Sequence, residues 1–302
     1  MKAAAKPRPA ARSLADDVAA FLAQGEAKGL SPRTLRWGYG FPLQKVLLPF
    51  CQQRGMKSAA QLDQAAVDAL ARELHARDLA PASVRSYLNS IRVFLKWTKE
   101  TDARPHLPRL RKVELDVLTL KEMRALEEGC PTLRDQLIIR LLADTGMREG
   151  ELASIRLSDI RESGDGYFIR IRGKTGERMV SISETLHDRL KRFIRTRPKE
   201  VASDRLFLGL QRRPSGSYEP LTGSGIYQVV TNAAARLKWK RRVYAHLLRH
   251  SNITLRAAAG QHPATISAET GASQAIIAST YTHPALRDRH ASTMRVLRDE
   301  EP

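Results

Sequence analysis

Two short clusters place an arginine beside groups that could position it for phosphate chemistry. Residues 145–152 read TGMREGEL, so Arg148 follows a glycine and Glu151 stands three residues later. A guanidinium is a planar fork of donors that fits phosphate oxygens, and the carboxylate of Glu151 could hold that fork in place. Residues 246–250 read HLLRH, which puts His246 and Arg249 on one face if the segment is helical. Taken alone, the clusters also fit a surface arginine at a helix start and an ordinary amphipathic helix end.

A lysine and a tyrosine are candidates for further steps of such chemistry. Lys174 lies in the turn GKTG of residues 173–176, between two segments that alternate apolar and polar residues. That pattern predicts a β-hairpin, and a two-stranded ribbon can carry its turn into a DNA groove. Tyr281 opens the sequence YTH, which ends at His283. Alternatively, Lys174 is a solvated turn residue, and composition alone singles out none of the 7 tyrosines as a nucleophile.

The second half of the chain must supply the elements that position these groups. Apolar residues recur there at helical spacing, and one strongly apolar helix is expected to be buried and to end at Gly146. The expected elements are helices over 118–129, 131–146 and 151–160, a hairpin over 167–183, helices over 183–196 and 221–240, and, from Tyr244 onward, helices broken by glycine and proline. The pattern indicates an α+β unit with little β-structure.

The first 100 residues show helical periodicity and no strand pattern. The expected helices cover residues 13–27, 31–54, 58–78 and 81–100. Residues 101–116 hold two prolines and several basic side chains, so they are expected to form an extended basic linker. That linker is either solvated or crosses a DNA backbone. The sequence therefore predicts a helical bundle over 13–100 and a second domain over 117–290.

The two ends of the chain fall outside these domains. Residues 1–12 mix Lys and Arg with Ala and Pro, and are expected to be a basic flexible tail or an arm that touches DNA phosphates. They lack the apolar segment of a secretory signal. Residues 291–302 form a C-terminal tail, and Leu286, Met294 and Leu297 could make an apolar stripe. That stripe would dock on a neighbouring protomer or pack on its own domain.

Charge points to the kind of partner. The 302 residues include 51 Lys and Arg against 32 Asp and Glu, a formal net charge of +19. Residues 1–112 hold 20 basic and 9 acidic side chains, and residues 113–302 hold 31 and 23, so both halves are basic. Such an excess favours a polyanion, usually nucleic acid. The 2 cysteines exclude a disulfide framework and a cysteine-based metal site, and no apolar run is long enough to span a membrane.

The order and spacing of these clusters resemble the tyrosine recombinases of the phage-integrase family, and the Xer-type members most closely. The family pattern is T-G-x-R-x-x-E-L, a lysine on a hairpin turn, H-x-L-R-H, L-G-H, and a tyrosine followed by T-H. Here these boxes read TGMREGEL, GKTG, HLLRH, TGAS and STYTH. The segments SPRTLR, PASVRSYLNSIRVFLKW and PLTGSGIYQVV match as well. The implied fold is mainly α with a small β component, a SAM-like core-binding bundle followed by an α+β catalytic domain.

The resemblance also implies a mechanism. Tyr281 would attack a DNA phosphorus atom and form a 3′-phosphotyrosyl link. Arg148 and Arg249 would clamp the non-bridging oxygens, and His246 would add a donor or handle the tyrosine proton. Lys174 would protonate the departing 5′-oxygen. Glu151 and His283 are expected to support this site, and the resemblance implies no cofactor, metal or ATP.

One position departs from the family pattern. Where the family carries His or Trp after the glycine of the L-G-H box, this chain has Ala272 after Gly271. Alanine cannot donate a hydrogen bond, so either another group substitutes or the protein is slow or depends on a partner. Ser273, Gln274 and His283 are the nearby candidates for substitution. His262 has no expected role beyond that of a solvent-facing loop residue.

Partners follow from the resemblance too. We expect duplex DNA core sites, a homotetramer when synapsed that is either assembled or a monomer when free, action with or without an accessory factor, and a bacterial, cytoplasmic and nucleoid-associated location. The candidate DNA contacts are Arg33, Arg36, Arg85, Arg92, Arg236, Lys238, Lys240, Arg241 and Arg242. The role would be integration, excision, resolution or transposition of a mobile element, or chromosome-dimer resolution. Two alternatives are a DNA-binding architectural regulator with a degenerate site and a type IB topoisomerase.

Overall fold

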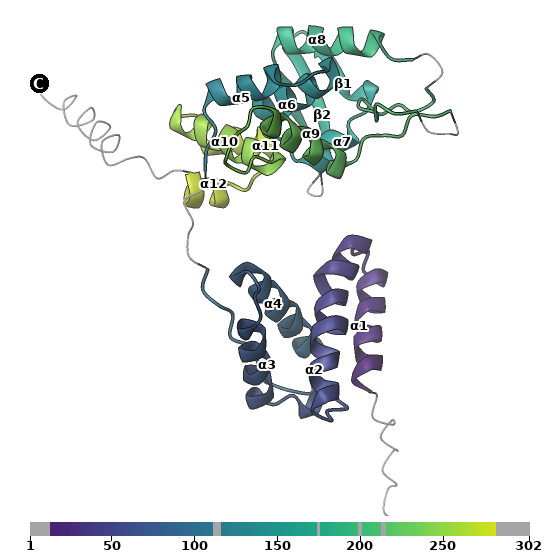
Figure 1. Cartoon of the computed structure of the whole chain (residues 1–302), viewed down its shortest axis with the longest axis vertical. Helices are drawn as coiled ribbons and strands as arrows, with labels where there is room; N and C mark the ends of the chain where they lie inside the picture. Colours follow the sequence, from purple (N-terminus) through teal and green to yellow (C-terminus); the bar gives the residue numbers. More distant parts are fainter. Residues whose placement is uncertain (1–12, 111–115, 174–175, 199–200, 213–215, 282–302) are drawn as a thin grey trace, which may run out of the picture. The chain divides into compact units, whose positions relative to one another are not determined.

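The structure is a computed structural model that describes residues 13–110, 116–173, 176–198, 201–212 and 216–281, with the side chains of Thr280 and Tyr281 left out. The predicted N-terminal and C-terminal tails, Lys174 and His283 lie outside the described residues. The chain divides into two compact units, Met1–Val113 and Glu114–Pro302. Described residues are mainly helical with one small sheet (Figure 1), so the predicted fold class is confirmed.

The first unit is a bundle of helices around its own core. Helix α1 (Leu14–Ala27) is capped by Ser13, α2 spans Leu48–Gln53, α3 spans Gln64–Ala76, and α4 spans Pro81–Thr98. The side chains of Phe50, Leu70, Leu88, Phe94 and others close the core. The four predicted helices are present in outline, because each presents an apolar stripe that must be covered.

Two of these helices differ in detail from the prediction. The segment before α2 winds as π-helix over Thr34–Gly40 and Leu43–Leu47. Pro42 lies between these turns and has no N–H to donate, which disfavours a regular α-helix there. The third helix begins later than Ser58, because the side chain of Asp63 caps it by accepting from the Ala66 N–H at 2.8 Å.

The start of the predicted linker packs on the first unit. Thr101 Oγ1 donates to the Leu62 carbonyl at 2.7 Å, and the Arg104 N–H donates to Gln64 Oε1 at 3.0 Å. Ala103 is buried, and Arg85 Nη1 donates to the carbonyl of Pro108 at 2.7 Å. Residues 101–110 have no regular secondary structure, yet much of the segment is held by the bundle.

The second unit begins with three helices that lead to the predicted chemistry. Helix α5 (Leu120–Glu128) is capped by Thr119, and α6 (Leu133–Thr145) is largely buried. The α6 helix ends at Gly146, as predicted, with a φ of 62° that glycine tolerates best. After a short turn, α7 (Glu149–Ser154) starts directly behind Arg148.

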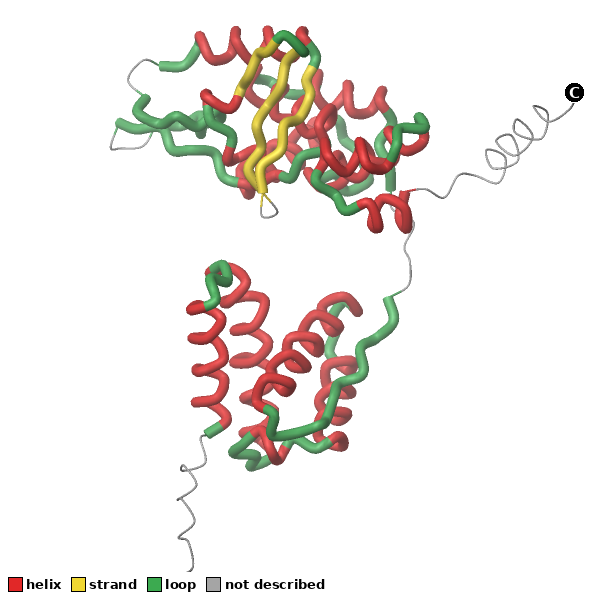
Figure 2. Tube along the Cα trace, turned by 180° about the vertical axis from the view of Figure 1, so that it is seen from behind, coloured by secondary structure: helices red, strands yellow, loops and turns green. Residues whose placement is uncertain are grey.

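A three-stranded antiparallel sheet follows in the order β1 (Ile160–Ser163), β2 (Gly166–Gly173) and β3 (Gly176–Ile182). The β2–β3 pair is the predicted hairpin. The helix predicted over 151–160 ends as an α-helix at Ser154, and only a 3-10 turn over Leu157–Asp159 follows before β1. The α-helix stops because Leu157 and Ile155 hydrogen-bond with the distant residues Asp204 and Leu206 instead. Figure 2 shows the three strands side by side against the helices of this unit.

Five further helices complete the unit. They are α8 (Glu184–Arg195), α9 (Gly223–Arg236), α10 (Ala245–Ala258), α11 (Pro263–Thr270) and α12 (Gln274–Tyr281). Apolar residues of α5, α6, α9, α10 and the sheet form its main core. A search of the described residues finds no helix with the length and apolar character needed to cross a membrane.

Candidate active site

Arg148 and Glu151 meet at the start of α7. The Arg148 N–H donates to Glu151 Oε2 at 2.9 Å, and its guanidinium Nη1 donates to Oε1 at 3.0 Å. The side chain of Glu151 is only 6% exposed, whereas that of Arg148 is 49% exposed. The buried carboxylate therefore fixes the guanidinium at the helix start while Arg148 still faces solvent.

A second arginine that the sequence analysis did not identify shares this carboxylate. Arg178 on β3 donates from Nη1 to Glu151 Oε1 at 3.0 Å and from Nη2 to Oε2 at 2.7 Å. Burial of Glu151 opposes its ionisation, but the hydrogen bonds from Arg178 and Arg148 outweigh that effect and lower its pKa. The carboxylate is therefore held as an anion between two guanidinium groups.

Arg249 is buried on α10 and reaches two backbone carbonyls. Its Nη1 donates to the carbonyl of Gly146 at 2.7 Å and to that of Thr270 at 2.6 Å. Arg148 Nη2 donates to the next carbonyl, that of Gly271, at 3.3 Å. The two predicted clamp arginines, which lie 101 positions apart by their residue numbers, thus bind adjacent carbonyls. Those carbonyls lie in the segment that leads from α11 into α12, the helix that ends at Tyr281.

His246 lies one helical turn before Arg249. The residue is exposed, but its surroundings still remove water from part of the ring. This desolvation and the charges of Arg249 and Arg148 lower the pKa of His246. The imidazole is therefore neutral near pH 7 and can accept a proton or donate from one nitrogen. We call Arg148, Glu151, Arg178, His246 and Arg249 the arginine cluster.

Ala272 packs in an apolar cluster and has no polar side-chain group to offer the arginine cluster. It is buried in a small apolar cluster with Ile253, Ile266 and Ile277, which joins α10, α11 and α12. Its neighbour Ser273 accepts a hydrogen bond from the Ile276 N–H at 3.3 Å and so caps α12. The alanine thus secures the start of the tyrosine helix by packing, and one proposed substitute, Ser273, already has a structural partner.

The end of β2 approaches the arginine cluster. Gly173 ends β2, and a Cβ built on it would lie 3.0 Å from Glu151 Oε1. The next residue along the chain is Lys174, outside the described part of the structure. Gly173 therefore allows the close approach of hairpin and carboxylate that a larger residue would hinder.

A profile of the phage integrase family matches residues 116–287, more than half of the chain. The chain belongs to the phage integrase family. The match contains every residue of the arginine cluster together with Tyr281. The prediction of a tyrosine-type site-specific recombinase is therefore confirmed at the level of family and enzyme class.

Individual relatives agree with this assignment. The tyrosine recombinase XerA of Saccharolobus solfataricus is 28% identical over 218 residues, which cover 72% of this chain and 68% of the relative. The tyrosine recombinase XerD of Staphylococcus saprophyticus is 27% identical over 274 residues, covering 85% and 89%. The solved structure of XerH bound to palindromic difH in a post-cleavage complex has a TM-score of 0.70 at 21% identity, and the match covers 88% of this chain and 81% of that one.

The candidate DNA contacts of this phage integrase family member differ in exposure and in their protein partners. Arg33, Arg36, Arg92, Arg236, Lys238 and Lys240 are exposed. Four members of the set also have protein partners. Arg92 Nη2 donates to Asn89 Oδ1 at 2.7 Å, Arg85 donates to the carbonyl of Pro108, Arg242 Nη2 donates to the Tyr227 hydroxyl at 3.0 Å, and Arg241 forms ion pairs with Asp116 and Glu122. The pair with Glu122 raises the pKa of Arg241. Arg241 is the member of the set whose charge is most fully compensated within the protein.

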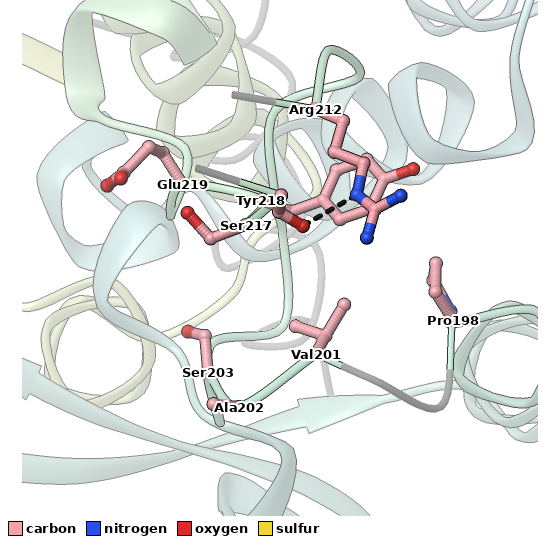
Figure 3. A pocket seen from close by; sticks show the side chains of 9 residues that line it. Pro198, Val201, Ala202, Ser203, Arg212, Ser217, Tyr218 and Glu219 are labelled. Carbon is pink, nitrogen blue, oxygen red and sulfur yellow. Dashed lines mark hydrogen bonds between the residues drawn. The ribbon is translucent and has the colours of Figure 1, made fainter. Parts of the chain in front are cut away.

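The second unit also has a cavity of about 470 Å³, and none of the residues that line it belongs to the arginine cluster. Figure 3 shows it between Pro198, Val201, Arg212 and Tyr218, with the Nε of Arg212 donating to the carbonyl of Gly216 at 2.6 Å. Its arginine is thus held by its own loop. Within the described ranges, no group of three His, Cys, Asp or Glu residues is arranged to hold a metal ion.

Proposed function

We propose that this chain cleaves and rejoins DNA strands at specific sites through a 3′-phosphotyrosyl link formed by Tyr281. The observation that carries the proposal is the meeting of Arg148 and Arg249 on the adjacent carbonyls of Gly271 and Thr270. Two guanidinium groups are thereby bonded to the segment that leads into α12, the helix that ends at Tyr281. Fixed cations at this point match the charge that develops on phosphate oxygens in the transition state.

Each remaining residue takes a defined step. The Tyr281 oxygen forms a bond to phosphorus, the bond from phosphorus to the 5′-oxygen breaks, and Lys174 gives its proton to that oxygen. His246 accepts the tyrosine proton, since its lowered pKa leaves it neutral. A 5′-hydroxyl of another strand then attacks the link and releases Tyr281. The phosphate bond energy is retained in the link, so rejoining requires no added energy source.

The proposed substrate is a pair of duplex DNA core sites held by a tetramer of this chain, with or without an accessory factor. The formal charge of +19 and the basic character of both halves support a polyanionic partner. Related solved structures are of recombinases bound to DNA, such as XerH with its difH substrate. Integration, excision, resolution or transposition of a mobile element is the proposed role.

Trapping the covalent link tests the proposal. Duplexes that bind the purified full chain would first be selected from a randomised pool, and then nicked near the centre so that cleavage releases a short strand and cannot reverse. We expect a protein–DNA band in denaturing gels with the natural chain. Tyr281→Phe lacks the attacking oxygen and should bind the same DNA without forming the band.

Two outcomes would contradict the proposal. A covalent band with Tyr281→Phe would assign the nucleophile to another residue. Specific binding by the natural chain with no covalent band at any nick position would favour the alternative of an architectural regulator with a degenerate site.

A further inference from the structure

We propose that Arg178 is a positioning residue that orients Arg148 and ties the Lys174 hairpin to the segment before the Tyr281 helix. The inference rests on the proposed function and deepens it. Arg178 lies on β3, four residues after Lys174 along the hairpin. It acts through Glu151 and the carbonyl of Glu269.

The first observation is the bonding of the Glu151 carboxylate. It accepts four hydrogen bonds, two from Arg148 and two from Arg178, at 2.7–3.0 Å. The Arg178 side chain is 13% exposed. A buried carboxylate with bidentate arginine on one side has little freedom to rotate, so Arg178 fixes the direction in which Glu151 presents itself to Arg148.

The second observation is the link to the other side of the site. Arg178 Nε donates to the carbonyl of Glu269 at 2.9 Å, near the end of α11. A Cβ built on Gly271 would lie 3.0 Å from Arg178 Nη1, so the guanidinium is packed directly against this glycine. The Glu269 carboxylate also accepts from the N–H and hydroxyl of Ser181 on β3. One side chain therefore spans the hairpin, α7 and the segment that leads into α12.

Charge gives a second reason for two arginines on one carboxylate. An ion pair formed by Arg148 and Glu151 alone would be neutral overall and would attract a phosphate only weakly. With Arg178 added, the two guanidinium groups and one carboxylate carry a net positive charge. Arg148 can then be held by Glu151 while the group as a whole still attracts the anionic transition state.

The test compares two arginines of the same sheet. Arg178→Gln removes one arginine from Glu151. The matched control is Arg170→Gln, because Arg170 also pairs with a buried carboxylate, Asp159, which keeps a second arginine in Arg172. Single-turnover formation of the covalent link at saturating protein should fall about 100-fold in Arg178→Gln, with DNA affinity within about three-fold of the natural chain. The Arg170→Gln rate should stay within about three-fold of the natural rate.

A modified substrate separates positioning from general damage. The modified DNA carries a methylphosphonate in place of the scissile phosphate. A methyl group then replaces one charged oxygen, so less cationic charge is needed to stabilise the transition state. The loss of rate that Arg178→Gln causes in formation of the covalent link should be at least about ten-fold smaller on one methylphosphonate stereoisomer than on the phosphate. The loss of rate caused by Arg148→Ala should become smaller in the same way. Arg178→Lys, which keeps charge but not the bidentate geometry, should recover only part of the rate.

Different results would contradict the positioning role of Arg178 and the proposed function. An Arg178→Gln rate equal to the natural rate, or an equal loss on the phosphate and the methylphosphonate, would overturn the positioning role. Failure of the natural chain to form any covalent link would overturn the proposed function instead. The positioning role keeps its own readout in that case. The charge of Arg148 lowers the pKa of His246, so both Arg148→Ala and Arg178→Gln should raise that pKa. An unchanged pKa of His246 in Arg178→Gln would contradict the positioning role.

Discussion

At the residue scale, the site works by placing charges around groups that would otherwise be costly to bury. Glu151 stays ionised because two guanidinium groups surround it. His246 experiences the opposite effect, because partial loss of water and the charges of Arg249 and Arg148 disfavour its protonation. The same cations that would stabilise a phosphate therefore keep the neighbouring imidazole neutral and ready to accept a proton.

The titration of His246 checks this account. We expect an NMR titration of the free protein to give a His246 pKa below its ordinary value of 6.5. Arg148→Ala should raise it towards that value, because one repelling charge is lost. Since the pKa of the folded protein is the lower one, the contribution to stability is present above pH 6.5 and is lost as the pH falls through the folded pKa. A value at or above 6.5 would contradict the assignment.

At the element scale, one glycine connects the end of α6 to the clamp. Gly146 has a φ of 62°, and its carbonyl accepts from Arg249. Asn252 on α10 donates from Nδ2 to the carbonyls of Ala143 and Asp144 at 2.8 and 3.0 Å, which holds α10 against the same helix end. A Cβ built on Gly146 would lie 2.7 Å from Asn252 Oδ1. The helix end, the asparagine and the arginine therefore depend on each other.

Gly146→Ala should destabilise the protein, because it combines an unfavourable backbone conformation with this clash. We expect the free energy of unfolding to fall by about 1–3 kcal/mol in urea titrations followed by circular dichroism. The matched control is Gly150→Ala within α7, where an added Cβ meets nothing within 4 Å. That change should be neutral or stabilising by up to about 1 kcal/mol. Equal behaviour of the two variants would show that Gly146 is not constrained as described.

At the scale of the whole molecule, charge and packing are organised differently. Each compact unit has its own apolar core, one built around Phe50 and Phe94 and the other around α6. The positive charge is instead spread over both halves of the chain. Not every basic residue is available to DNA, however, since Arg241 is paired with Asp116 and Glu122 whereas Lys240 is exposed.

Salt dependence of DNA binding distinguishes these two neighbours. In fluorescence anisotropy titrations at several salt concentrations, we expect the logarithm of affinity to fall linearly with the logarithm of salt. Lys240→Gln should reduce the magnitude of the slope by about 0.9, the value for one lost phosphate contact. Arg241→Gln removes the same charge but should change the slope less, because its charge is already compensated. A larger effect from Arg241→Gln would mean that its ion pairs open on DNA.

The sequence by itself determined the helix and hairpin pattern and the identity of the chemical groups. Those features are local: apolar periodicity, the capping residues Ser13 and Thr119, the glycine after α6 and the boxes around Arg148 and Arg249 all lie within short stretches. The pairing of Arg148 with Glu151 belongs to the same class, because the two residues are separated by less than one helical turn.

Only the tertiary structure decided the rest. Arg178 could not be recognised, because its partner Glu151 is 27 residues away and an arginine on a strand carries no local signal of function. The helix predicted over 151–160 ends early because Ile155 and Leu157 bond to residues 51 and 47 positions later. The strand β1 was missed because its residues are mostly exposed and polar, so its pairing with β2 leaves no apolar alternation in the sequence. The meeting of Arg148 and Arg249 on the carbonyls of Gly271 and Thr270 likewise requires α7, α10 and α11 to pack. Such contacts depend on which distant segments can bury their surfaces together, and no short stretch of sequence encodes that.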